Sequence, residues 1–546
     1  MLTTASPKIF VGRNEILETL NKRVESLKSG YRQNLALTGQ KLCGKTSILQ
    51  NFLSTLNSDS IVPVYIEVIA EPLETFSKKF IGTMLFNFLK GSEEYIKEDL
   101  NFLIFKAEGT IPKTASAIKE VLALLDKGDL QEAYSNLFNL TSVLKLETGK
   151  SCIIILDEFH NLSSVNLKNP FAVFGKRIMV QKDTMYVVTS SQVSTIKRIL
   201  KEKLDLLFGN FEIIEIKDFD YGVAKAFLEK RLEGIRVQEE LKDFLISFTD
   251  SRPYYLDAIA AELNSLAAQL QFKWLATGHI SQALENLFFD SKGSINQYFQ
   301  NLIAGFSQGS YANEYLSILT AISEGKKRLS QIRSAFSGKK NELGPRMERL
   351  IEENFIAKNG MMHYFNDKVF EFWLKHVYNK KRYSLLSNFQ DRANMFRREI
   401  EDMIALFLSE NKKDIATRLK ELIASFNNEV LKIGEKSLKL PKFENFKTEG
   451  QICESGILSV RAEYGGKKFW VFNFSPQPVD EPGMSRVIER ITAMKLAPQR
   501  NVFIAFAGID ANAMLIAKEN KVWVLGKEDL NLLMPLFNKF KILKYP

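Results

Sequence analysis

The sequence predicts an α/β fold: a five-stranded parallel sheet, then a mainly helical region, then a second and smaller α/β domain. Over the first 220 residues, apolar runs rich in β-branched residues alternate with helical patterns. Unbroken apolar runs are typical of parallel strands that are covered on both faces. After residue 220 helical patterns dominate, and short strands return beyond residue 400. The five strands are expected at residues 34–38, 61–69, 151–156, 184–192 and 211–216.

The composition is that of an ordinary globular protein. The chain has 546 residues, of which 45% are hydrophobic and 25% charged, and this length suggests about three domains. Lysine and arginine number 74 against 64 acidic residues, a formal net charge of +10. This surplus favours a polyanionic partner no more than it favours a basic surface that merely keeps the protein dissolved.

The cysteines and the apolar runs bear on location. The three cysteines, Cys43, Cys152 and Cys453, lie far apart in the sequence, which fits a reducing compartment. No apolar run approaches the roughly 20 residues that span a bilayer, and the first seven residues lack the regions of a signal peptide. We therefore expect a cytoplasmic protein without a membrane partner.

The strongest pattern is a loop between the first strand and an amphipathic helix. It reads Gly39-Gln40-Lys41-Leu42-Cys43-Gly44-Lys45-Thr46, a complete match to G-x-x-x-x-G-K-[ST], and Ser47 follows it. The two glycines let backbone N–H groups turn inward, and the Thr46 hydroxyl can ligate Mg²⁺. Lys45 is expected to be a solvent-accessible charge that acts on the β- and γ-phosphates. Residues 39–47 are thus predicted to cradle phosphates.

Two acids follow the third predicted strand. Carboxylates at the carboxyl end of a parallel strand face the ligand crevice, so we expect Asp157 to hold Mg²⁺ through its water shell and Glu158 to polarise an attacking water. The next strand ends in hydroxyl residues. Ser190 or Ser191 could bond a γ-oxygen there, and a simple strand-end turn is the alternative. His160 is assigned no role.

A further motif, Phe10-Val11-Gly12-Arg13-Asn14-Glu15, precedes the loop. With residues 39–46 it resembles the archaeal-type STAND and AAA+ ATPases, in which a Phe/Tyr-Val-Gly-Arg-x-x-Glu signature packs against adenine. In this chain the glutamate comes one position early. The resemblance implies that ATP is the ligand, that Val11, Gly12 and Arg13 lie at the nucleotide, and that the strand-end serines are the γ-phosphate sensor.

The resemblance extends to residues 249–256, which are similar to the family's Gly-Gly-x-Pro-Tyr-Tyr-Leu stretch. It implies that Pro253 contacts the adenine side, and Arg252 could reach a phosphate. The family's two glycines are Asp250 and Ser251 in this chain. Relatives tend to carry an arginine near the position of Asn210, so the source of an arginine finger stays open.

Four segments follow from these patterns: a P-loop ATPase core at 1–220, a helical lid at 221–305, a winged helix at 306–380, and linker helices with a nuclease-like domain at 381–546. The winged helix rests on three helical patterns and a hairpin around Asn359-Gly360, a type I′ turn signal. Arg346 and Arg349 on the third helix are candidate contacts to double-stranded DNA. Glutamates beside them would repel DNA, so docking of an unknown protein stays an equal reading.

The C-terminal order of hairpin, helix, strand, helix and strand resembles the restriction-endonuclease-like fold that accompanies many archaeal-type ATPases. Such nucleases need an Asp on the first hairpin strand and Glu-x-Lys on the second to hold a metal and activate water. Aligned by pattern, this chain offers Leu458, Asn473 and Ser475. We expect a domain that has the fold and no nuclease activity.

The sequence therefore predicts an ATPase switch that uses ATP and Mg²⁺ and couples its nucleotide state to DNA or protein. A DNA-binding factor with structural ATP, akin to origin-recognition proteins, is the first alternative. The second alternative is an ATPase-linked nuclease whose catalytic residues lie at positions other than 458, 473 and 475.

Overall fold

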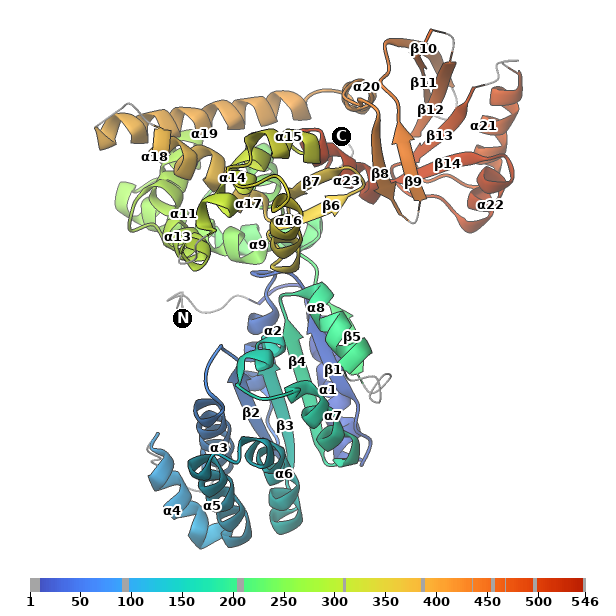
Figure 1. Cartoon of the computed structure of the whole chain (residues 1–546). Coiled ribbons are helices and arrows are strands. Elements are labelled where there is room, and N and C mark those ends of the chain that lie inside the picture. The colour runs from blue at the N-terminus through green and yellow to red at the C-terminus, as the bar shows by residue number, and fades with distance from the viewer. Residues whose placement is uncertain are drawn as a thin grey trace. The chain divides into compact units, whose positions relative to one another are not determined.

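The computed structural model describes residues 10–90, 98–203, 211–307, 311–383, 388–434, 436–452, 457–466, 468–493 and 498–543. The chain forms two compact units, and Figure 1 shows the elements of each. The first unit comprises Met1–Lys230 and Arg252–Tyr255, and the second comprises Arg231–Ser251 and Leu256–Pro546. Asn210 and Cys453 lie outside the described residues.

The first unit is built on the five-stranded parallel sheet that the sequence predicts. Its strand order is β2-β3-β4-β1-β5, and every pair is parallel. The strands are β1 (Asn34–Thr38), β2 (Ile61–Glu67), β3 (Ser151–Asp157), β4 (Thr184–Ser190) and β5 (Phe211–Glu215).

Burial explains why these runs are uninterrupted apolar sequence. Every residue of β3 is buried, and successive side chains enter two different cores. Ile154 packs on one face of the sheet and Ile153 and Ile155 pack on the other. A strand with both faces covered has no position at which a polar side chain would meet water.

Helices cover both faces of this sheet (Figure 1). Between β2 and β3 the chain inserts four helices, α3 to α6, as expected from the helical pattern between residues 74 and 147. The helices of the first unit are α1 (Asn14–Lys28), α2 (Lys45–Thr55), α3 (Leu73–Leu89), α4 (Leu100–Thr110), α5 (Pro112–Lys127), α6 (Leu130–Thr148), η1 (Phe159–Ser164), α7 (Pro170–Val180), α8 (Val193–Arg198), η2 (Ile199–Lys203) and α9 (Tyr221–Arg231).

The second unit begins with helices. They are α10 (Glu239–Phe248), α11 (Pro253–Leu270), α12 (Thr277–Leu284), η4 (Glu285–Phe289), α13 (Ser294–Ser307), α14 (Ala312–Ser323), α15 (Leu329–Ala335), α16 (Leu343–Glu352), α17 (Lys368–Trp373), η5 (Leu374–Tyr378), α18 (Asn379–Tyr383) and α19 (Phe389–Asn411). Between α16 and α17 lies the hairpin of β6 (Ile356–Asn359) and β7 (Met362–Phe365).

The hairpin turn differs from the expected type I′ turn at Asn359-Gly360. Asn359 pairs with Met362, so the two turn residues are Gly360 and Met361. Only Gly360 has a positive φ, at +57°, whereas a type I′ turn needs two. The turn also packs against β8, because Met361 N–H donates to Val430 O at 3.0 Å and a Cβ on Gly360 would lie 1.8 Å from that oxygen.

The rest of the second unit holds a five-stranded mixed sheet in the order β10-β11-β12-β13-β14. The pairs β10–β11 and β11–β12 are antiparallel, and β12–β13 and β13–β14 are parallel. Its elements, with a separate β8–β9 hairpin, are α20 (Ile415–Ala424), β8 (Glu429–Ile433), β9 (Lys436–Leu440), β10 (Asn445–Ile452), β11 (Ile457–Tyr464), β12 (Lys468–Ser475), α21 (Glu481–Ala493), β13 (Arg500–Ala505), α22 (Ala511–Glu519), β14 (Val522–Gly526) and α23 (Lys527–Leu536).

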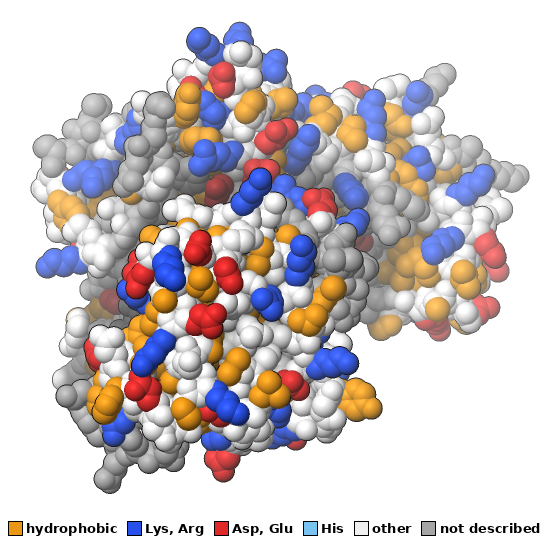
Figure 2. All heavy atoms as spheres, turned by 60° about the horizontal axis from the view of Figure 1, so that its bottom comes forward, with side chains coloured by type: hydrophobic (Ala, Val, Ile, Leu, Met, Phe, Trp, Pro, Cys, Tyr) orange, Lys and Arg blue, Asp and Glu red, His pale blue; other side chains and the backbone are white. Residues whose placement is uncertain are grey.

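Of the helices that the structure describes, none is both long and apolar enough to cross a membrane. Figure 2 shows basic and acidic side chains mixed across the face that it presents. The excess of lysine and arginine in the sequence thus does not form one continuous basic patch on that face.

Candidate functional site

The predicted phosphate loop joins β1 to α2, and its backbone explains its glycines. Gly44 has φ +97° and precedes α2 directly, a conformation that costs glycine little. A Cβ on Gly39 would lie 2.3 Å from the carbonyl oxygen of Ile216. Leu42 also has a positive φ of +67°, and the Cys43 side chain is buried with 1% exposure. The side chains of Lys41 and Ser47 are exposed.

Lys45 differs from the expected solvent-accessible charge. It is 5% exposed, and its ammonium group donates to the carbonyl oxygens of Gly39 at 2.9 Å and Gln40 at 3.0 Å. The reason is that Lys45 is the first residue of α2, so its side chain extends back along the inside of the loop. The loop carbonyls supply the acceptors that a buried ammonium group needs.

Asp157 accepts hydrogen bonds from hydroxyl groups of three elements, α2, β2 and β4. Its Oδ2 accepts from Thr46 and from Tyr65, each at 2.8 Å, and its Oδ1 accepts from Thr189. Asp157 is 2% exposed. The burial of Tyr65 and its closeness to Asp157 raise the pKa of that phenol, so it stays a hydrogen-bond donor. The carboxylate is therefore held in one orientation beside Thr46.

Glu158 follows in a left-handed conformation with φ +54°. Two contacts from β4 and the residue after it hold this turn. The Glu158 N–H donates to Thr189 Oγ1 at 3.0 Å, and the Ser191 N–H donates to Glu158 Oε2 at 2.8 Å. The hydroxyl of Ser191 is buried and has no hydrogen-bond partner among the described residues.

His160 joins the same group of side chains. Its Nδ1 lies 3.0 Å from Ser190 Oγ and 3.3 Å from Glu158 Oε2. Burial lowers the pKa of His160, and Lys41 and Lys45 lower it further, while Glu158 acts in the opposite direction. The ring is therefore neutral near pH 7.

The front motif lies against the segment that follows β5. Arg13 donates to the carbonyl oxygen of Lys217 at 2.5 Å and lies over the ring of Phe219, 5.0 Å from its centroid. Gly12 has φ +60°, and Val11 is half-buried. The motif is thus held in place by a segment about 200 residues later in the chain.

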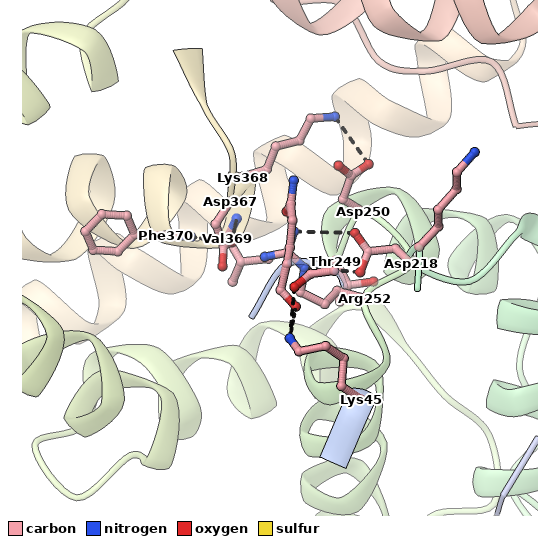
Figure 3. A network of polar contacts seen from close by, with 12 residues as sticks. Lys45, Asp218, Thr249, Asp250, Arg252, Asp367, Lys368, Val369 and Phe370 are labelled. Atoms are coloured by element: carbon pink, nitrogen blue, oxygen red, sulfur yellow. Dashed lines mark hydrogen bonds and ion pairs between the residues drawn. The ribbon is translucent and has the colours of Figure 1, made fainter. Parts of the chain in front are cut away.

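Arg252 is hydrogen-bonded to the phosphate loop. It is 4% exposed, and its guanidinium group donates to Gln40 Oε1 at 2.5 Å and lies 3.3 Å from Asp218 Oδ1 (Figure 3). Pro253 comes next, is half-buried and begins α11. The Arg252 side chain therefore links the stretch 249–256 to Gln40 in the phosphate loop.

Asp250 and Ser251, which replace two glycines of the resembled families, keep a glycine-like backbone. Their φ angles are +53° and +61°, which is uncommon for residues with a Cβ. Within the second unit the Asp250 carboxylate pairs with Lys368 at 3.6 Å (Figure 3). It also pairs with Lys541. Aspartate is among the residues that tolerate this region best, and its ion pairs help to hold it there.

The structure thus brings Thr46, Asp157, Glu158, Ser190 and Ser191 together at the carboxyl ends of β1, β3 and β4. This is the edge of a parallel sheet where ligands bind. Sequence reasoning missed Tyr65 and Thr189. Thr189 belongs to the same run of hydroxyl residues and could have been found there, whereas no local signal singles out Tyr65.

The two arginines proposed for DNA lie in the second unit and differ from each other. Arg346 donates to Glu314 at 2.7 Å and stacks over Tyr311, 3.8 Å from the ring centroid. Its side chain is 13% exposed. Arg349 is exposed. Only Arg349 is therefore placed to contact a phosphate without breaking an ion pair.

One position aligned with the nuclease residues, Asn473, belongs to a buried polar pair. Ser459 Oγ donates to Asn473 Oδ1 at 2.6 Å, and both side chains are buried. Leu458, which the pattern alignment used, packs into the apolar core on the opposite face with Trp470 and Phe472. The residue that faces Asn473 is therefore Ser459, because a shift of one residue along a strand reverses the face.

Comparisons with known proteins agree with the phosphate loop. Residues 10–259 match the family model ATPase_2, described as an ATPase domain predominantly from Archaea. The uncharacterized protein MJECL04 of Methanocaldococcus jannaschii is 23% identical over 385 residues, which are 68% of this chain and 69% of that protein. The match supports a nucleotide-binding ATPase domain in the first part of the chain.

Two solved structures are similar at low identity. The Walker-type ATPase PABY2304 of Pyrococcus abyssi has a TM-score of 0.47 and 19% identity, and the alignment covers 68% of this chain and 99% of that one. The ORC2 protein of Aeropyrum pernix, solved as ADPNP–ADP complexes, has a TM-score of 0.43 and 11% identity, with 74% and 98% covered.

Proposed function

We propose that this chain binds ATP with Mg²⁺, hydrolyses it, and acts as a switch of the STAND/AAA+ class whose nucleotide state controls a partner. One observation carries the proposal: Thr46 donates to Asp157 at 2.8 Å, beside a Glu158 that is fixed by the Ser191 N–H. A metal-binding hydroxyl, a buried carboxylate and a separately anchored second carboxylate are the parts that phosphoryl transfer to water requires.

The donor set of this site fits Mg²⁺. Thr46 uses its hydrogen on Asp157 and keeps oxygen lone pairs for a cation, and Asp157 offers carboxylate oxygens, which Mg²⁺ prefers. Bound MgATP would supply a γ-phosphorus open to attack, with its charge neutralised by the metal. Lys45 would exchange loop carbonyls for phosphate oxygens.

The remaining predicted residues take roles around this centre. Glu158 would accept the proton of the attacking water, and the buried Ser191 hydroxyl, or Ser190, would bond a γ-oxygen. Val11, Gly12, Arg13 and Pro253 would hold the adenine side. Residues 39–47 would cradle the phosphates with their backbone N–H groups.

The test compares two acids at the ends of neighbouring strands. Glu158→Gln should retain MgATP binding and lower the rate of phosphate release by about 10²-fold, the range of a lost general base. Glu67→Gln is the matched control, because Glu67 pairs in register with Asp157 and is exposed. Equal rates in the wild type and in Glu158→Gln would move the water-activating role elsewhere. A wild type that releases no phosphate with Mg²⁺ would refute the hydrolysis.

We propose that residues 306–380 form a winged helix used for docking rather than for reading DNA. Two contacts support this choice: Arg346 is paired with Glu314, and the hairpin turn is tied to β8, with Asn359 bonded to both backbone groups of Lys432 at 2.9 and 2.6 Å. A hairpin turn that is hydrogen-bonded to β8 is not free to enter a groove of DNA. If the winged helix instead binds DNA, the affinity for duplex DNA should fall steeply as the salt concentration rises. Titrations with duplex DNA at two salt concentrations, with and without ATP, test this alternative.

We propose that the β10–β14 sheet with α21 and α22 is a nuclease-like domain without catalysis. Its strand order supports the fold. The aligned positions Leu458, Asn473 and Ser475 offer neither carboxylate nor lysine, and neither does Ser459, which pairs with Asn473. Single- and double-stranded DNA and RNA incubated with Mg²⁺ or Mn²⁺ should give no products above an EDTA control. Metal-dependent cleavage would overturn this reading.

A further inference from the structure

His160 lies where the ends of β3 and β4 meet. It is the second residue of η1, and the first, Phe159, is fully buried against Phe171 and Phe174, with ring centroids 5.3 and 5.1 Å away. This anchor fixes the start of η1. A single atom of His160, Nδ1, then reaches both Ser190 Oγ and Glu158 Oε2, at 3.0 and 3.3 Å. The His160 side chain is 11% exposed.

The neighbours decide which ring nitrogen carries the proton. The neutral ring has one N–H, and Glu158 Oε2 can only accept. A proton on Nδ1 makes the approach to Glu158 a donor–acceptor contact, whereas a proton on Nε2 would leave two lone pairs facing each other at 3.3 Å. Ser190 Oγ can accept from the same N–H at 3.0 Å. The network therefore selects the Nδ1–H tautomer.

We propose that His160, as its Nδ1–H tautomer, is a positioning residue for Glu158. The Ser191 N–H alone would let the carboxylate pivot about one hydrogen bond. The imidazole adds a second donor to the same oxygen, Oε2, so that Oε1 is presented to water in a fixed direction. This role rests on the proposed hydrolysis, in which Glu158 takes the proton of the attacking water.

The experiment separates positioning from nucleotide binding. His160→Phe keeps a ring and removes both nitrogens, and should lower kcat about tenfold while the Kd for MgATP stays within twofold. His160→Asn places an amide near Nδ1 and should recover most of that loss. In a Glu158→Gln background, His160→Phe should cause no further loss, because the two residues act as one unit.

The control is Asn161→Ala. Asn161 is the next residue of η1, and its side chain bonds the carbonyl oxygen of Val68 at 2.9 Å. This variant tests whether loosening η1 is enough to lower kcat, and no change in kcat is expected. An unchanged kcat in His160→Phe, an equal loss in Asn161→Ala, or a loss confined to MgATP affinity would each overturn the positioning role.

A second measurement does not depend on turnover. The chain has four histidines, so the ¹⁵N signals of the ring of His160 can be assigned by their loss in His160→Asn. We expect a protonated Nδ1 in the wild type and a shifted Nδ1 signal in Glu158→Gln. A protonated Nε2 would overturn the proposal. A wild type that shows this tautomer but does not hydrolyse ATP would refute the proposed function. The positioning role would be refuted with it, although the contact between His160 Nδ1–H and Glu158 would be confirmed.

Discussion

Replacing Thr189 with valine removes one hydroxyl that serves both acids of the site. The Thr189 hydroxyl donates to Asp157 Oδ1 and accepts the Glu158 N–H at 3.0 Å. Valine has nearly the same shape, so the change isolates two hydrogen bonds in a position with 0% exposure. We expect Thr189→Val to weaken both the turn after β3 and the orientation of Asp157.

The magnitude follows from the two lost bonds. A hydrogen bond to a charged group contributes about 1.5–3 kcal/mol, and an N–H left without a partner costs about 1–3 kcal/mol. The Glu158 N–H bond is only partly buried, which favours the lower end of both ranges, so we expect the free energy of unfolding to fall by about 3 kcal/mol. The Mg²⁺-dependent part of ATP affinity should fall about tenfold, because Asp157 loses one of three hydroxyls that orient it.

Thr184→Val is the matched control on the same strand. Thr184 is equally buried, and its hydroxyl donates to the neutral hydroxyl of Thr141 at 2.8 Å and to no acid among the described residues. A neutral bond of this kind contributes about 1 kcal/mol. Urea unfolding and ATP titrations with Mg²⁺ or EDTA measure both effects. Equal destabilisation by the two variants, or unchanged Mg²⁺ dependence in Thr189→Val, would refute the reasoning.

Three further predictions concern other parts of the chain. Lys45→Ala should abolish MgATP binding in an equilibrium titration while the circular dichroism spectrum stays native, and retained affinity would remove the site assignment. Arg346→Ala should lower the unfolding free energy, measured by urea unfolding, because it removes both the ion pair with Glu314 and the stacking on Tyr311. Arg349→Ala should change it little, because Arg349 is exposed, and should alter only the salt dependence of any DNA binding. Burial, Lys375 and Lys380 lower the pKa of His376 to about 4, whereas Glu399, whose Oε2 lies 2.9 Å from Nδ1, acts in the opposite direction. Because burial dominates, the unfolded chain binds a proton below pH 6.5 that the folded chain binds only at lower pH; the free energy of unfolding should fall as the pH drops through this window, and less so in His376→Gln, whereas a stability that rises would show that the Glu399 contact dominates.

The local parts of the site could be read from the sequence. A strand, a glycine loop and a helix start are consecutive residues, so the motif at 39–46 specifies the loop backbone directly. Apolar runs identified all five strands of the first sheet. The central strands β3 and β4 are buried throughout because both of their faces are covered, whereas the edge strand β5 combines apolar residues with Glu212 and Glu215. Asp157 and Glu158 follow from the same logic, since they mark where such a strand ends.

Pairing between distant segments was decided by the tertiary structure. The sequence offered three consecutive hydroxyl residues at the end of one strand, and only the packing of β4 beside β3 makes Thr189 the one that bonds Asp157. Tyr65 reaches the same carboxylate from β2 through the parallel register, which no local pattern encodes. Arg346 carries a charge that suits DNA, yet Glu314, 32 residues earlier, neutralises it.

The exact register of the strands was also decided by the tertiary structure, because two positions differ by one residue from the expectation. The hairpin turn was expected at Asn359-Gly360 and lies at Gly360-Met361, and the residue opposite Asn473 is Ser459 rather than Leu458. Apolar periodicity determines that a strand exists, because each residue responds to its own burial. Register depends on which partner strand is adjacent, and the free energy that selects it comes from contacts made only when the chain is folded.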